Sequence, residues 1–179
     1  QAKKLKIINS EVADFKPKKK LQVVTLFHVL EHIEEPQQLL KHIKAHIIER
    51  GGYLVIQVPN YDSIERHVFK EKWFSFDVPR HIWQFNEKVV ADLLDKAGYS
   101  VKGAFKTNAP LHPVTIVPSI NRELDIQRIW VKKNAHPLYA KAMTLAWAAM
   151  TLLTIPLTIV QNIVGRSSML TVVAKPKED

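Results

Sequence analysis

The stretch from Leu21 to Asn60 constrains the fold of this chain more than any other part of the sequence. It opens with a short apolar run, Leu21 to Phe27, which is typical of a strand buried on both faces of a parallel sheet. A helical pattern follows, with Pro36 at its first position and apolar residues recurring along one face. A second apolar run, Tyr53 to Val58, then has the character of another buried strand.

This order of strand, helix and strand predicts a right-handed crossover between two parallel strands of an α/β sheet. We expect one helix over residues 36–50, which Gly51-Gly52 ends in a left-handed cap. Ligands of such sheets bind at the carboxyl ends of the strands. Four polar side chains follow the two predicted strands and are therefore candidates for a functional site: His28, Glu31, His32 and Asn60.

Further elements are predicted on both sides of this crossover. Asp62 or Ser63 can cap a polar helix, and Asn86 can cap a helix that Gly98 ends. The expected elements are a short strand at Lys6 to Ile8, a helix over 61–72, a helix over 87–97, a strand from Tyr99 to Phe105 and a last strand from Met169 to Ala174.

Four segments, HVLEHIEEP, GGYLVIQVPN, WFSFDVPRHIWQF and LLDKAGYSV, occur in this order between Leu21 and Val101. In their order and spacing they resemble the second half of class I S-adenosylmethionine-dependent methyltransferases, and within that family the branch with the ubiquinone-biosynthesis O-methyltransferases. The resemblance implies a Rossmann-like methyltransferase sheet, truncated at the N-terminus, with S-adenosyl-L-methionine as cofactor. Family members open with a glycine-rich G-x-G-x-G turn, whereas the five glycines of this chain come later. We therefore expect these 179 residues alone to bind the cofactor weakly.

The resemblance also implies roles for individual residues. Three positions before the central strand would contact the adenine ring, and three at that strand's end would also contact the cofactor: Ser10, Glu11, Val12, Leu26, Phe27 and His28. Five positions would contact the methyl acceptor: Asn60, Trp73, Arg80, His81 and Trp83. His81 is the candidate general base and His28 a second catalytic candidate, while a purely structural role for His81, bonded to the backbone, stays open.

HVLEH admits other readings. It also spells H-x-x-E-H, in which His28 and His32 on one helical face would bind zinc beside Glu31 as a base. The same three residues could instead hold a divalent cation that polarises a substrate hydroxyl. The third reading, which we favour, is that Glu31 and His32 hydrogen-bond the turn, so no metal ligand is assigned.

Composition restricts the possible classes of function. The chain has no cysteine, which excludes disulfides, thiolate metal sites and a thiol nucleophile, and fits a reducing cytoplasm. Its net charge is +9. A basic surface of this kind is either a solvated face or a site for anionic lipid or nucleic acid, and a non-catalytic lipid- or nucleic-acid-binding module is an alternative function.

The C-terminal part contains a long uncharged segment, residues 142–165. We expect two helices broken at Pro156, inserted before the last strand and packed on the domain or resting on a membrane through residues 138–165. The domain prediction is a methyltransferase core over 1–106, a helical insertion over 107–166, and the last strand and tail over 167–179. The predicted partner is a small-molecule or lipid-like acceptor, and nucleic acid is not favoured. The predicted location is the cytoplasm, with peripheral membrane contact through residues 138–165 as an option.

Overall fold

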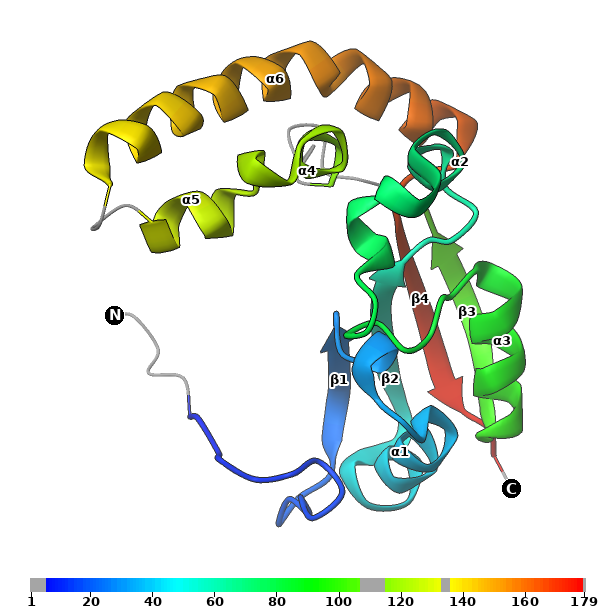
Figure 1. Cartoon of the computed structure of the whole chain (residues 1–179). Helices are drawn as coiled ribbons and strands as arrows, with labels where there is room; N and C mark the ends of the chain where they lie inside the picture. Colours follow the sequence, from blue (N-terminus) through cyan, green and yellow to red (C-terminus); the bar gives the residue numbers. More distant parts are fainter. Residues whose placement is uncertain (1–5, 107–114, 133–135, 179) are drawn as a thin grey trace, which may run out of the picture.

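The computed structural model describes residues 6–106, 115–132 and 136–178. Its centre is a four-stranded sheet in the order β1, β2, β4, β3 (Figure 1). β1 and β2 run parallel, whereas β4 is antiparallel to both of its neighbours. The strands are β1 (Leu21–Phe27), β2 (Ile48–Pro59), β3 (Tyr99–Phe105) and β4 (Met169–Pro176). This mixed sheet confirms the predicted fold class and the adjacent parallel pair, β1 and β2.

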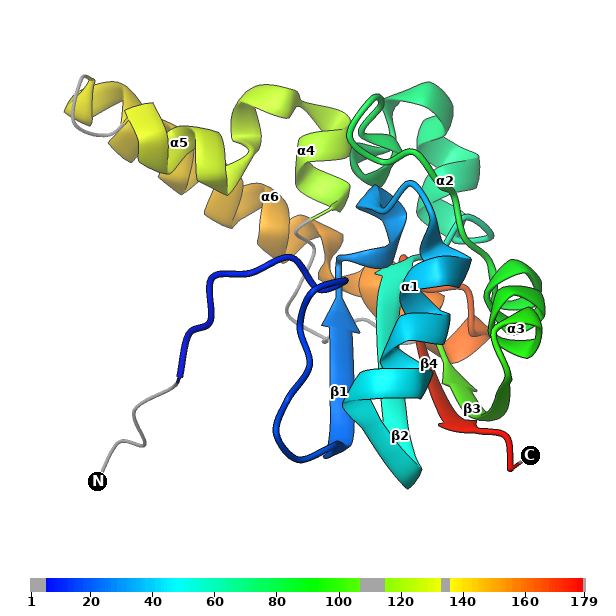
Figure 2. The same ribbon diagram turned by 90° about the horizontal axis from the view of Figure 1, so that it is seen from below.

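Two helices pack on the sheet and share its core. α1 (Pro36–His42), which continues as a π-helical turn to Ile47, connects β1 to β2, and α3 (Glu87–Lys96) precedes β3. α1 contacts α3, and α3 contacts β3 and β4. Their buried side chains form one core with the strands, and Figure 2 shows this layer from a second side. The remaining helices are α2 (Ile64–Phe69) and, between β3 and β4, α4 (Ile116–Ile120), α5 (Ile126–Lys132) and α6 (Pro137–Val164).

The crossover differs from the prediction at its glycines. The helix ends at Ile47, so Gly51 and Gly52 lie inside β2 and do not cap a helix. Gly51 has φ +78°, and a Cβ on Gly52 would lie 2.9 Å from the carbonyl oxygen of Gln22 on β1. The two glycines therefore let β2 bulge and pass close to β1, where the strand register shifts.

β1 is less buried than its apolar sequence predicts. Leu26 is buried and Val24 half-buried, and both belong to or pack against the core. Val23 and Phe27, which alternate with them, are exposed. An apolar run therefore correctly predicts the strand here, but it does not show which faces of that strand other elements cover.

Local capping chemistry is predicted correctly. The side chain of Ser63 accepts a hydrogen bond from the backbone N–H of Arg66 at the start of α2, and Asn86 accepts one from Val89 in α3. Two expected elements differ: residues 6–8 form no strand, and the helix expected over 61–72 shortens to α2 with a 3₁₀ turn at Lys70–Lys72.

The expected break at Pro156 does not occur. α6 runs through Pro156 as one helix, drawn in Figure 1 as a single curved ribbon. A proline inside a helix removes one backbone hydrogen bond and costs about 3 kcal/mol. The helix is retained because its inner face is anchored: Thr154, Thr158 and Gln161 on both sides of the proline are buried.

A buried carboxyl group joins the helices to the sheet. Glu65 on α2 accepts a hydrogen bond of 2.6 Å from the hydroxyl of Thr115, the residue before α4. The side chains of Ser168, Gln161 and Trp73 also lie near this carboxyl group. Burial raises the pKa of Glu65, and these polar neighbours limit the rise.

The raised pKa of Glu65 predicts a pH-dependent stability. The folded chain holds this proton more tightly than the unfolded chain, so the free energy of unfolding should fall as pH rises from about 4.5 through the raised pKa. Glu65→Gln should remove this part of the slope, because glutamine is neutral throughout. Urea denaturation across this pH range checks the expectation, with exposed Glu71→Gln as the control. A slope in Glu65→Gln equal to that of the native protein would contradict it.

Candidate functional site

Two loops meet beyond the carboxyl ends of β1 and β2. One is the 3₁₀ turn Leu30–His32 after β1, and the other is the segment 77–85 before α3. The backbone oxygen of Glu31 accepts a hydrogen bond from the N–H of Ile82 at 3.0 Å. The indole N–H of Trp83 donates to the carbonyl of Ile33 at 2.8 Å. These bonds hold the two loops together at the edge of the sheet where the sequence predicts a site.

The place where these two loops meet, which we call the junction, brings two histidine rings into contact. The ring centroids of His32 and His81 lie 4.7 Å apart at an interplanar angle of 64°. Nδ1 of His32 lies 2.9 Å from the carbonyl oxygen of Arg80, and Nδ1 of His81 lies 2.7 Å from that of Ser75. A carbonyl oxygen only accepts, so each Nδ1 must carry the hydrogen. In the neutral rings both Nε2 atoms therefore hold lone pairs.

Glu31 completes the cluster. Its side chain is 1% exposed, and Oε1 lies 3.2 Å from Nδ1 of His28. Its other oxygen, Oε2, has no hydrogen-bond partner among the described residues. His28 itself takes a left-handed conformation with φ +53°, directly after β1. A buried carboxylate oxygen without a partner is a strong acceptor for a proton or a cation.

Glu31, His32 and His81 fit a divalent cation. Each offers one ligand atom, and these atoms lie within 4.8 Å of one another. Both histidines donate Nδ1–H to a carbonyl group, an arrangement that orients metal-binding imidazoles. His28 is not part of this group, which therefore differs in one ligand from the alternative cation site of His28, Glu31 and His32. Glu31 and His32 also hold the loops together by hydrogen bonds. The backbone oxygen of Glu31 accepts from Ile82, and Nδ1 of His32 donates to the carbonyl of Arg80.

The zinc-peptidase reading of HVLEH is wrong. That motif needs both histidines on one face of a continuous helix. Here His28 lies outside the helix at φ +53°, and only Leu30–His32 form a 3₁₀ turn.

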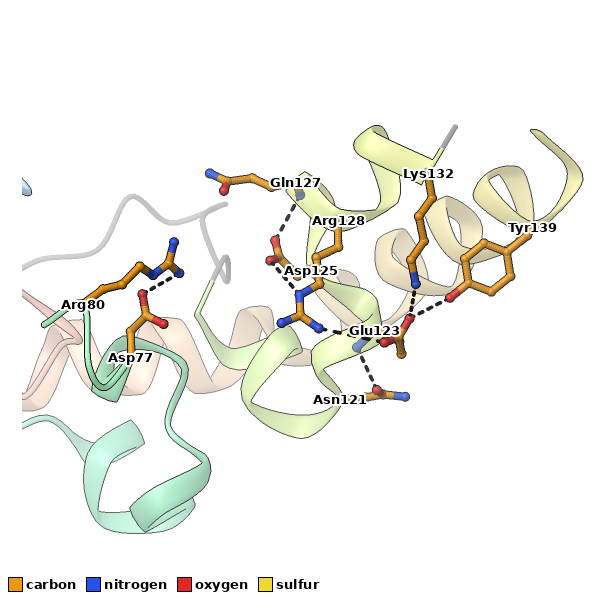
Figure 3. Close-up of polar contacts among 9 residues, drawn as sticks. All are labelled: Asp77, Arg80, Asn121, Glu123, Asp125, Gln127, Arg128, Lys132 and Tyr139. Carbon is orange, nitrogen blue, oxygen red and sulfur yellow. Dashed lines mark hydrogen bonds and ion pairs between the residues drawn. The ribbon is translucent and has the colours of Figure 1, made fainter. Parts of the chain in front are cut away.

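The structure distributes the predicted acceptor-binding residues over exposed and buried positions. Trp83 and the side chain of Arg80 are exposed, and Arg80 pairs with Asp77 at 2.6 Å (Figure 3). Trp73 is fully buried. Asn60 is buried too, and its amide donates to the carbonyl of Ser167 at 2.8 Å and accepts from the N–H of Asp62. Only His81, Arg80 and Trp83 thus lie in the segment that forms the junction, and contact with an acceptor stays a prediction for all five.

The predicted cofactor-binding residues lie in two places. Leu26, Phe27 and His28 are at the end of β1, beside the junction. Ser10, Glu11 and Val12 lie in an exposed segment before β1, where the N–H of Asp14 donates to Glu11. Their contact with the adenine ring stays a prediction.

The sequence did not indicate the pairing of Glu31 and His32 with His81. These residues lie far apart along the chain, and the bonds that join their loops go to the backbone carbonyls of Arg80 and Glu31. Because every residue carries a carbonyl group, such bonds leave no signal in side-chain patterns.

Comparison with known proteins defines the family. Residues 2–102 match the family model described as a methyltransferase domain. Among solved structures, the chain is similar to a methyltransferase dependent on S-adenosylmethionine from Archaeoglobus fulgidus, with TM-score 0.51, 16% identity and coverage of 94% of this chain and 66% of that one. It is similar to a candidate sarcosine dimethylglycine methyltransferase from Galdieria sulphuraria, with TM-score 0.53, 10% identity and coverage of 95% and 58%. No curated protein sequence matches.

The chain therefore belongs to the family of class I S-adenosylmethionine-dependent methyltransferase domains. It spans 58% and 55% of the length of the first two similar structures. The second of these is the [4+2]-cyclase SpnF, with TM-score 0.52, 12% identity and coverage of 95% of this chain, so the shared fold does not by itself fix the reaction. The family resemblance is confirmed, while the ubiquinone-biosynthesis branch stays a prediction.

Proposed function

We propose that this chain forms the acceptor side of a methyltransferase that methylates a hydroxyl oxygen. The observation that carries the proposal is the pair of histidines, His32 and His81, with Nδ1 anchored and Nε2 left as an acceptor. S-Adenosylmethionine, when bound, supplies an electrophilic methyl group. The protein must then orient the acceptor, exclude water and remove one proton.

His81 is the residue proposed to take the proton. Its ring is held by the carbonyl of Ser75, so Nε2 keeps a fixed direction. Histidine is the side chain that most often acts as a general base close to neutral pH. Glu31 lies in the same cluster, and its carboxylate would stabilise the imidazolium that forms.

An oxygen acceptor is favoured over other atoms by two features. The sequence resembles the ubiquinone-biosynthesis O-methyltransferases, and a hydroxyl group is an acceptor from which a base must withdraw a proton. Exposed Trp83 beside His81 offers an apolar surface for a small or lipid-like acceptor.

A second candidate mechanism uses the same residues to hold a cation. The buried Oε2 of Glu31 and the Nε2 atoms of His32 and His81 would bind a divalent cation, which would lower the pKa of the acceptor hydroxyl. Titration of Mn²⁺ into the metal-free protein distinguishes the two mechanisms, because only the second needs binding that Glu31→Gln abolishes.

The experiment for the proposed function uses the natural protein that contains this chain. The protein is incubated with S-adenosylmethionine and either a lipid extract or an aqueous extract of the cells that produce it naturally. Formation of S-adenosylhomocysteine is then measured. We expect product with the lipid extract and a new methyl ether in the extracted lipid. Methylation found only on nitrogen or carbon would contradict the proposal.

A further inference from the structure

An apolar stripe runs along the outer face of α6. Leu138, Leu145 and Leu152 are spaced seven residues apart, so they lie on one side of the helix. Together with Ile163 their exposed fractions are 81%, 65%, 68% and 80%, in the order of the sequence. Further exposed apolar side chains flank them: Leu153, Ile159, Val160 and Val164. We call these eight residues the α6 stripe.

The opposite face of α6 is the one that packs on the protein. Ala140, Thr154 and Gln161 are buried there, and α6 contacts α4, α5 and the turn Arg122–Leu124. The helix therefore leaves an apolar face outward over its full length of about 42 Å. Water is a poor surrounding for such a face, since each exposed leucine forgoes about 1.5–3 kcal/mol of burial.

Several hydroxyl groups of α6 bond to the backbone of the same helix. The hydroxyl of Thr144 donates to the carbonyl of Ala140 at 2.7 Å, and that of Thr154 donates to Met150 at 3.0 Å. Residues 142–165 contain no charged side chain. The outer face of this segment therefore carries no charge that would oppose contact with lipid. By length and composition α6 is also apolar enough to enter a membrane.

α5 and α6 form a helical hairpin, and a polar cluster holds the two helices together near the start of α6. Glu123 accepts hydrogen bonds of 2.9 Å from both Lys132 on α5 and Tyr139 on α6 (Figure 3). These bonds lower the pKa of Glu123, which stays ionised. The hairpin therefore presents the α6 stripe from a fixed support. Trp130 on α5 is exposed at the same end, and indole rings favour membrane interfaces.

The sequence around the stripe is rich in basic residues. From Asn121 to Arg166 it contains two acidic residues, Glu123 and Asp125, which pair with neighbouring cations. The basic residues of the same segment are Arg122, Arg128, Lys132, Lys133, Lys141 and Arg166. An apolar face in a segment of net positive charge matches the chemistry of an anionic lipid surface.

We propose that the α6 stripe binds the surface of an anionic lipid bilayer, with α6 lying in the plane of the membrane. A spanning orientation is not favoured, because α6 contacts α4 and α5 along its inner face and the chain continues directly into β4. Crossing the bilayer would carry the charged side chains of α5 into hydrocarbon.

This inference deepens the proposed function, on which its link to the acceptor rests. An apolar groove of about 470 Å³ lies between α5 and α6. Ile129, Trp130, Pro137, Ala140, Thr144 and Leu145 line it, with Lys141 at the same site. A groove of this chemistry suits an acyl chain, so membrane contact would bring a lipid-like acceptor to the enzyme.

Sedimentation with lipid vesicles tests the proposal and needs neither cofactor nor acceptor, so its failure leaves the proposed methyl transfer untouched. Vesicles of phosphatidylcholine alone are compared with vesicles that also contain phosphatidylglycerol, at low and high salt. We expect binding to the anionic vesicles that weakens at high salt. Leu145→Glu and Leu152→Glu should each lower the partition coefficient by about tenfold or more, whereas Val89→Glu on exposed α3 should not.

Depth measurements test the orientation. Because the chain has no cysteine, a single environment-sensitive label can be placed at Leu138→Cys, Leu145→Cys, Leu152→Cys or Ile163→Cys. In-plane binding predicts similar, shallow depths at all four positions, measured with spin-labelled lipids. The proposal is overturned if the depth changes steadily along α6, or if the protein does not bind anionic vesicles. It is also overturned if Leu145→Glu leaves the partition coefficient unchanged, or if self-association buries the labels without vesicles.

Discussion

Replacing His81 by alanine is expected to lower the rate of methyl transfer by about 10²–10⁴-fold, while the affinity for S-adenosylmethionine changes much less. The change removes the Nε2 lone pair that is proposed to take the acceptor proton, and Nε2 is free because Nδ1 donates to Ser75. Turnover and cofactor affinity are measured separately, by formation of S-adenosylhomocysteine and by calorimetry. His46→Ala is the control, because His46 is exposed on the helix that links β1 to β2.

A second variant separates proton transfer from loop anchoring. His81→Asn keeps an N–H near the position of Nδ1, so it can still donate to the carbonyl of Ser75, but it has no imidazole Nε2. If His81 is the base, asparagine and alanine should impair turnover equally. Recovery of the rate in His81→Asn would instead give His81 the structural role that the sequence left open.

Trp73→Ala is expected to destabilise the protein by about 3–5 kcal/mol. Trp73 is fully buried, and its side chain lies against the Glu65 carboxyl that joins α2 to α4 and β4. Loss of the indole would leave a cavity beside that carboxyl group. Urea denaturation followed by circular dichroism measures the change without relying on tryptophan fluorescence.

Trp83→Ala is the matched control for the other tryptophan of this segment. Trp83 is exposed, and its indole N–H bonds the carbonyl of Ile33 in the junction. We expect a loss of about 1 kcal/mol in stability but a clear rise in the KM for the acceptor. If Trp73→Ala left the stability unchanged and raised the KM for the acceptor, Trp73 would bind the acceptor and would not be a residue that stabilises the core.

The sequence predicts the parts of the fold that depend on local chemistry. Ser63 and Asn86 cap their helices as expected, because a cap needs only a short polar side chain and the next turn of backbone. The adjacency of β1 and β2 follows from apolar runs and the crossover rule. The sequence does not predict a continuous helix through Pro156, because the burial of Thr154, Thr158 and Gln161 depends on packing against other elements.

The site is predicted only in part for the same reason. His28, Glu31 and His32 were placed correctly at the end of β1, since the carboxyl end of a buried strand is readable from the sequence. Their partner His81 was not, because the two loops are joined by bonds to the backbone carbonyls of Arg80 and Glu31. A three-dimensional arrangement was needed to replace His28 by His81 in the candidate cation site.

The most direct test of the central claim is the protonation state of the two histidine rings. Long-range ¹⁵N–¹H NMR spectra of ¹⁵N-labelled protein distinguish a ring protonated at Nδ1 from one protonated at Nε2. At a pH above the histidine pKa values, the structure predicts that both His32 and His81 carry the hydrogen on Nδ1, with Nε2 free to accept. Hydrogen on Nε2 of His81 would contradict the account, because the ring would then have no lone pair to offer the acceptor hydroxyl.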